Sequence, residues 1–181
     1  MKNKQAIQIL KDHLLPVFES LGFETPVIQA GKYLTWRKEE QLHTLAFCCQ
    51  LDKWPWDPWI GSRFVVEWTE ETNDKIIKRA RFADVANQQE LDEVSELQNS
   101  VIAKFHIPTK EEYSEKVGVQ VQDDAFFLDR YEDACQLVKY QKDRRSDIWF
   151  RYLQKNDVEL WALFLARWIS SAESRFLSFT G

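Results

Sequence analysis

Two carboxylates near the middle of the chain, Asp57 and Glu67, have the residue type that metal-dependent hydrolysis needs. Nucleases of the restriction type place an acid on one strand and an acid-x-lysine motif on the next, which holds a divalent cation beside a phosphate. The residue two positions after Glu67 is Thr69, so the lysine of that motif is missing. Solvent-facing carboxylates are therefore the favoured interpretation, and a metal-dependent hydrolase or nuclease is the alternative.

The cysteines and histidines form no recognisable reaction centre. Cys48, Cys49 and Cys135 are odd in number and contain no C-x-x-C motif, which disfavours disulfides and zinc and favours reduced thiols. His43 shares a predicted strand with Cys48 and Cys49 but is too far along it for direct contact. The five glycines form no phosphate-binding loop. We predict no catalytic residue, no metal and no cofactor.

The sharpest feature is the loop DKWPWDPWIGS over residues 52–62. Pro55 and Pro58 remove backbone donors, so the loop is neither helix nor ladder and its side chains must order it. Its indoles either close over the end of a sheet or present a surface for an aromatic ring, a cation or a partner protein. The predicted binding residues are Trp54, Trp56, Asp57 and Trp59 of the loop, with Gln50 and Trp68 of the flanking strands.

The segments on both sides of the loop have the alternation of β-strands. Leu45, Phe47, Cys49 and Leu51 fall on one face of the first, and Phe64, Val66 and Trp68 on one face of the second. Residues 33–38 predict a further strand joined to the first by a hairpin, and residues 148–153 predict another. Residues 75–82 are a candidate extra strand, although their alternation is irregular. Residues 117–122 are either a short edge strand or a linker.

Apolar residues at helical spacing predict four longer helices. The first covers residues 7–21 and should kink or divide at Pro16. The second covers residues 91–105 behind an Asn87–Glu90 capping pattern, and the same pattern at Thr109 and Glu112 begins a short turn. The third covers residues 126–140. The fourth follows the capping pair Asn156 and Glu159 and should be the central packing element.

Length and composition predict one folded domain over residues 1–181, and the predicted helices and strands make it α+β. Hydrophobic residues make up 44% and charged residues 29% of the chain, which is typical of a globular protein. We expect an antiparallel sheet of about four or five strands with the helices packed mainly on one face. The 8 tryptophans and 12 phenylalanines weakly favour a binding role, because interfaces are rich in aromatic residues.

The net charge of −5 makes nucleic acid an unlikely partner. The basic residues between Lys75 and Arg81, and Lys142, Arg144 and Arg145, are best interpreted as solvated faces. The longest apolar segment, residues 160–169, is too short to span a membrane and contains Arg167, and the N-terminus has no signal-type run. These features predict a cytoplasmic protein that does not bind membranes.

Several short motifs resemble an uncharacterised bacterial family, a domain of unknown function. They are Leu21-Gly22-Phe23 after the first helix, Gln50 near the end of a strand, FVVEW, RARFADV, ELQNSVIAKF, DIWFRYL and NDVELWALFLARWI. The resemblance covers most of the chain and implies an α+β fold and a bacterial cytoplasmic source. It implies no activity, so no functional residue is carried over from it.

The sequence thus predicts a non-enzymatic recognition module that binds a protein partner or a small ligand through the tryptophan-rich loop. The alternative is the metal-dependent hydrolase or nuclease that uses Asp57 and Glu67. A third possibility is that the aromatic residues form a homodimer interface.

Overall fold

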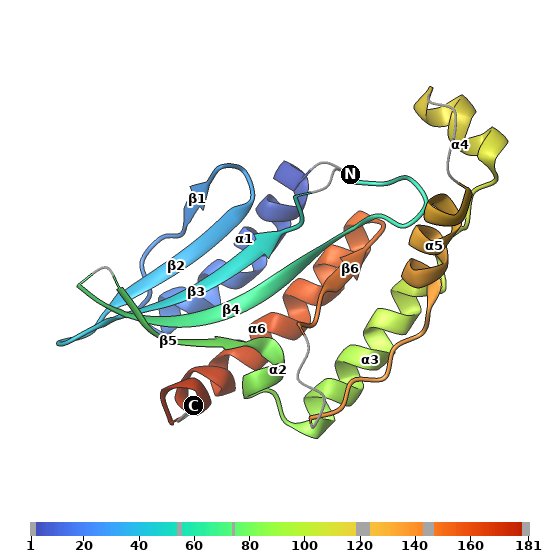
Figure 1. Cartoon of the computed structure of the whole chain (residues 1–181). Helices are drawn as coiled ribbons and strands as arrows, with labels where there is room; N and C mark the ends of the chain where they lie inside the picture. The colour runs from blue at the N-terminus through green and yellow to red at the C-terminus, as the bar shows by residue number, and fades with distance from the viewer. Residues whose placement is uncertain (1–2, 54–55, 74, 119–123, 143–146, 179–181) are drawn as a thin grey trace.

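The computed structural model describes residues 3–53, 56–73, 75–118, 124–142 and 147–178, with the backbone alone at 124–126. Figure 1 shows a curved sheet with helices along it and two helices beyond one end. In chain order the elements are α1 (Asn3–Ser20), β1 (Val27–Gln29), β2 (Tyr33–Glu39), β3 (Thr44–Leu51), β4 (Ser62–Thr72), β5 (Lys75–Arg81), α2 (Phe82–Val85), α3 (Gln88–Ile102), α4 (Lys110–Val117), α5 (Asp124–Cys135), β6 (Phe150–Tyr152) and α6 (Lys155–Ser178).

The sheet is antiparallel in the order β1-β2-β3-β4-β5, and this confirms the predicted α+β class. β4 is the longest strand, and one of its edges serves two partners. Its C-terminal part pairs with β5, and its first residues, Ser62–Phe64, pair with β6. The predicted strands at 33–38, 75–82 and 148–153 are therefore present. Most of the predicted segment 117–122 lies outside the described residues.

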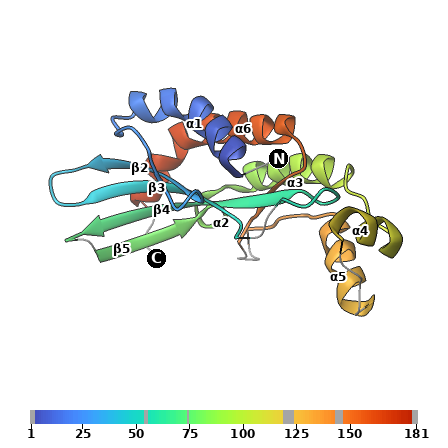
Figure 2. The ribbon, with the colours of Figure 1, turned by 90° about the horizontal axis from the view of Figure 1, so that it is seen from above.

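The helices cover one face of the sheet, and aromatic side chains fill the space between the two layers. Figure 2 shows α1 and α6 on one side, while no helix of the described chain lies over β2 to β5 on the other. Trp36 of β2 stacks on Phe18 of α1 at 4.4 Å between ring centroids. Trp68 of β4 stacks on Phe176 of α6 at 5.8 Å. α6 thus has the central packing role that the sequence predicts.

α1 is one helix that passes through Pro16, not two shorter pieces. Proline removes one backbone hydrogen bond from a helix interior. Leu14 and Phe18, on either side of it, are fully buried in the core. We attribute the continuity of α1 to this buried face, because packing of an apolar face supplies most of the stability of a helix in a protein.

Two of the three predicted capping patterns are confirmed. Asn87 accepts from Glu90 N and Thr109 accepts from Glu112 N, and each pair forms a reciprocal capping box. The third pattern, predicted at Asn156, is wrong. The buried Asp157 takes that role, since its carboxylate accepts from the backbone N–H groups just before α6 at 2.9 and 2.8 Å.

α5 ends at Cys135, earlier than predicted, and the chain after it runs extended beside α3. Two amide side chains of α3 form hydrogen bonds with the backbone of extended segments. Asn99 donates to the carbonyl of Val138 at 3.0 Å and accepts from its N–H at 2.8 Å. Gln98, which is fully buried, donates to Trp149 O at 3.0 Å and accepts from Arg151 N at 3.1 Å. These amides attach α3 to the segments that flank β6.

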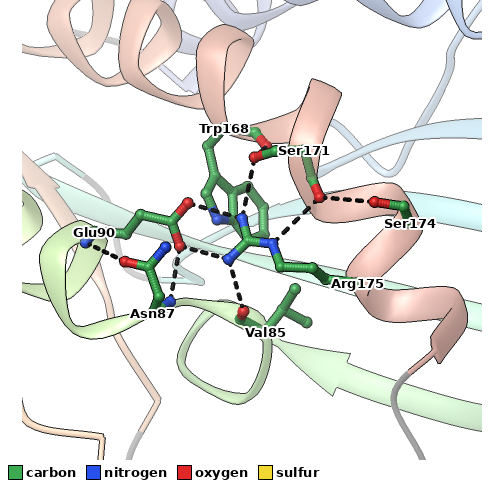
Figure 3. Close-up of polar contacts among 7 residues, drawn as sticks. All are labelled: Val85, Asn87, Glu90, Trp168, Ser171, Ser174 and Arg175. Carbon is green, nitrogen blue, oxygen red and sulfur yellow. Dashed lines mark hydrogen bonds and ion pairs between the residues drawn. The ribbon is translucent and has the colours of Figure 1, made fainter.

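The C-terminal part of α6 is joined to α2 and α3 by Arg175 (Figure 3). Its Nη1 and Nη2 atoms each donate to one oxygen of Glu90 at 2.7 Å. The other N–H groups donate to Val85 O and to the carbonyl and hydroxyl of Ser171. Because all five guanidinium N–H groups have acceptors inside the molecule, this cluster is structural and has no donor left for a ligand.

Candidate functional site

Asp57 organises the predicted tryptophan loop from inside. One carboxylate oxygen accepts from the N–H groups of Trp59 and Ile60 at 2.9 and 3.2 Å. The other accepts from Arg130 Nη2 and Tyr131 Oη, both at 3.0 Å. Burial, followed by the Asp57 charge, raises the pKa of Tyr131 well above its ordinary range. The carboxylate therefore fastens the loop to α5.

The described tryptophans of this loop also pack on the protein. Trp56 Nε1 donates to Leu153 O at 3.0 Å, and its ring packs against the core. The Trp59 ring stacks on Tyr113 of α4 with centroids 5.6 Å apart. Trp54 lies outside the described residues. The loop therefore joins the sheet to the α4–α5 pair, and its two described indoles already have partners inside the molecule.

Trp68 is the predicted binding residue that the structure excludes from the surface. Its side chain is fully buried between the sheet and the helices, where it contacts Phe47 and Phe176. Alternation puts Trp68 on the face of β4 that α1 and α6 cover, so no partner reaches it. Gln50, by contrast, lies on the opposite face and is half-buried.

The two carboxylates considered for metal chemistry are not brought together. Asp57 is used in the loop, whereas Glu67 lies in the middle of β4 within 3.3 Å of Arg79 and 3.2 Å of Arg81. The described part of the chain contains no group of three or more His, Cys, Asp or Glu side chains placed to hold a metal ion. No observation thus favours the hydrolase or nuclease alternative.

The cysteines are free and poorly suited to nucleophilic chemistry. Cys48 lies on the uncovered face beside Thr35, whose hydroxyl is 3.5 Å from its sulfur, and Cys49 lies in the core. Burial raises the pKa of both thiols. Since the thiolate is the nucleophile, a raised pKa lowers reactivity near neutral pH.

The uncovered face of the sheet, which we call the open face, carries rows of side chains that the strand register places side by side. One row runs Thr35, Cys48, Glu67 and Arg81 across four strands, and the next runs Arg37, Ala46, Thr69 and Arg79. Ala46, Val65 and Thr69 are buried although no helix covers them. The longer charged side chains around them must therefore shield them, as aliphatic stems of arginine commonly do.

Every cation at an open-face position of the described strands is an arginine. Five of the ten arginines of the chain, and none of its lysines, occupy open-face positions in the described strands; these are Arg37, Arg63, Arg79, Arg81 and Arg151. The predicted basic cluster is divided by the sheet, because Arg79 and Arg81 lie on the open face whereas Lys78 Nζ donates to Phe176 O on the other side. Arg144 and Arg145 lie outside the described residues.

These arginines are only partly satisfied by the protein. Arg37 pairs with Glu71 and Arg63 with Asp52, both at 2.6 Å, and Arg81 lies 3.6 Å from Asp147. Arg81 Nη1 is buried without an acceptor among the described residues. Glu67 Oε2 lies within ion-pair distance of the Nε atoms of Arg79 and Arg81 but accepts no hydrogen bond from the described residues. Unsatisfied donors of this kind are costly and unusual.

One corner of the open face combines arginine with tryptophan. The Arg63 guanidinium lies 4.5 Å from the ring centroid of Trp149, and Arg151 stands opposite Arg63 in the β4–β6 register. Arg151 Nη1 donates to Ala134 O at the end of α5 at 2.9 Å. Burial, followed by the charge of Arg63, lowers the pKa of Arg151 from its ordinary value. Two like charges therefore face each other here.

The arginines of the open face were missed as a site at the level of sequence. The available signal was the alternation of Arg63, Val65 and Glu67 with the core residues of β4. That signal places them on one face, but only the packing of α1 and α6 shows which face stays uncovered.

A separate groove of about 540 Å³ lies between the N-terminal parts of α1 and α6, lined among others by Ile9, Asp12, His13 and Glu159. Its charged groups are largely used locally, because Gln8 donates to Asp12 and Lys155 pairs with Glu159. It therefore offers less to a ligand than the open face does.

No described helix has the length and apolar character needed to cross a membrane. Comparison of the chain with protein-family models, with curated proteins and with solved structures found no match. The function must therefore be argued from the site itself.

Proposed function

We propose that the protein is a non-enzymatic recognition module of a bacterial cytoplasm that binds a partner protein on the open face of its sheet. The observation that carries the proposal is the choice of cation on this face, which is always arginine and never lysine in the described strands. Protein interfaces are enriched in arginine, tryptophan and tyrosine and depleted in lysine. Trp149 and the exposed Tyr33 complete this composition.

The charge balance of the face favours a protein over a nucleic acid. Glu67, Glu71, Asp52 and Asp147 lie beside the arginines, so the surface has both signs of charge. Nucleic acids attract proteins chiefly through excess positive charge, and a phosphate backbone would meet these carboxylates. A mixed surface instead selects a partner whose own charges have the complementary order.

The test is affinity capture from a bacterial lysate with three sets of substitutions. The open-face variant carries Arg37→Ala, Arg79→Ala and Trp149→Ala. A matched control carries Lys155→Ala and Arg167→Ala on α6, whose side chains are 73% and 69% exposed. A loop variant carries Trp54→Ala, Trp56→Ala and Trp59→Ala, and circular dichroism verifies the fold of each.

We expect the native protein and the α6 control to capture the same partner and the open-face variant to lose it. A partner that the open-face variant retains and the folded loop variant loses would reject the open face and return the site to the tryptophan loop. A partner that salt removes with the steep dependence of phosphate contacts would identify a nucleic acid instead.

A further inference from the structure

We infer that Arg63, Arg151 and Trp149 form a subsite for a carboxylate of the partner, so that the protein recognises an acidic residue at this corner of the open face. This inference rests on the proposed function and adds the chemistry of the group that is recognised. It starts from the opposed arginines, because like charges directly opposite each other in a sheet are destabilising. An anion between them would remove that repulsion.

Arg63 has the donors that such an anion needs. Its Nε atom donates to Asp52 Oδ2 at 2.6 Å, and Nη1 and Nη2 have no acceptor among the described residues. Its side chain is 39% exposed, and its guanidinium lies over the Trp149 ring. Contact with the ring restrains the position of the guanidinium. A planar carboxylate matches this pair of donors bidentately.

Arg151 is fixed at the other side of the subsite. Its Nη1 atom donates to the carbonyl of Ala134, where the C-terminal end of α5 favours a cation. Its remaining donors have no acceptor in the described part of the chain. The acids near this pair are Asp52, which is used by Arg63, and the exposed Asp133, to which Gln136 donates at 3.5 Å. Neither acid is hydrogen-bonded to Arg151.

The composition of the corner favours a carboxylate over a phosphate. Two arginines with Asp52 and Asp133 nearby supply little excess positive charge for a dianion. The half-buried Trp149 ring adds apolar surface to the corner, which suits the aliphatic stem of a glutamate or aspartate. The occupant we infer is thus an acidic side chain in an exposed segment of a protein.

The experiment follows the Nε–Hε resonances of Arg63 and Arg151 in the full-length protein by ¹⁵N NMR. Hexaglutamate and inorganic phosphate are titrated separately at an ionic strength held constant with chloride. The variants are Arg63→Lys, which keeps the charge but loses the planar pair of donors, and Arg167→Gln on α6 as the control. We expect hexaglutamate to shift both resonances, Arg63→Lys to weaken its binding about tenfold, and the control to leave it unchanged.

Three results would overturn the subsite: no shift at either arginine, equal weakening by Arg167→Gln, or tighter binding of phosphate than of hexaglutamate. The resonance shifts of the native protein test the subsite by themselves, so the test remains valid even if Arg63→Lys does not fold. If hexaglutamate does not bind but affinity capture finds a partner that depends on the open face, the subsite alone is rejected. Binding of hexaglutamate without such a partner would reject the proposed function alone.

Discussion

In the tryptophan loop, both oxygens of Asp57 accept hydrogen bonds from inside the molecule, and Trp56 Nε1 has a backbone acceptor. On the open face, the guanidinium of Arg63 uses one N–H group, and that of Arg79 has one carboxylate within ion-pair distance. The loop has the more unusual sequence, yet its polar groups are already used. Donors without partners therefore indicate a binding surface better than rare residue types do.

The same contrast holds between arginines. Arg175 has an acceptor for each of its N–H groups and joins three helices (Figure 3). The open-face arginines lie on a surface that no described helix covers (Figure 2). Substitution of Arg175 or of the loop residues should therefore lower the stability of the protein. Substitution of the open-face arginines should instead weaken the binding of a partner.

The largest effect on stability is expected from Gly61→Ala at the end of the loop. Gly61 has φ +68°, and an added Cβ would lie 1.9 Å from the carbonyl oxygen of Tyr152. We expect the free energy of unfolding to fall by about 4 kcal/mol or more, measured by urea denaturation. Gly31→Ala is the matched control, because Gly31 has φ +63° with no heavy atom within 4 Å, and should cost about 1 kcal/mol.

Equal and small losses in the two glycine variants would mean that the loop separates from β6 easily. The tryptophan loop would then be a better candidate for the binding surface than the open face.

A smaller loss is expected from Arg175→Met, which keeps the aliphatic stem but removes the guanidinium. Glu90 loses both of its 2.7 Å contacts to Arg175, so the free energy of unfolding should fall by about 2–3 kcal/mol. Arg79→Met on the open face should cost about 0.5 kcal/mol or less, because its side chain is 54% exposed and its ion pair is screened. Urea denaturation of both variants with an unchanged m-value measures the difference.

Comparable losses at Arg175 and Arg79 would contradict the division between structural and available arginines. The open-face ion pairs would then be part of what holds the sheet together.

The parts of the fold that depend on local sequence were predictable. Alternation identified β2 to β4, and the capping boxes at Asn87 and Thr109 begin α3 and α4 as expected. These signals need only residues a few positions apart. The early end of α5 was not predictable, since Val138 is held by Asn99, 39 positions away.

The site was only partly predictable for the same reason. Gln50 is half-buried on the open face, and its binding role stays a prediction. Trp68 was also expected to bind but is fully buried, because alternation does not say which face the helices cover. The opposition of Arg63 and Arg151 depends on β6 pairing with the start of β4, which brings together residues far apart in sequence. A single sequence contains no local signal for that contact.

A further effect on stability concerns the contact between the loop and α5, and it depends on pH. Tyr131→Phe removes the hydroxyl that donates to Asp57 and should lower the free energy of unfolding by about 1–2 kcal/mol near neutral pH. Burial and the Asp57 charge raise the pKa of Tyr131, so its contribution is complete below the unfolded value of about 10 and is lost as the pH rises toward the folded value. Stability of the native protein should therefore decline more steeply above pH 10 than that of Tyr131→Phe, as urea denaturation at pH 7 to 11 would measure. Parallel curves of stability against pH for the two proteins would show that Asp57 does not hold the phenol. The polar groups of the loop would then be less fully used inside the molecule than the contrast with the open face requires.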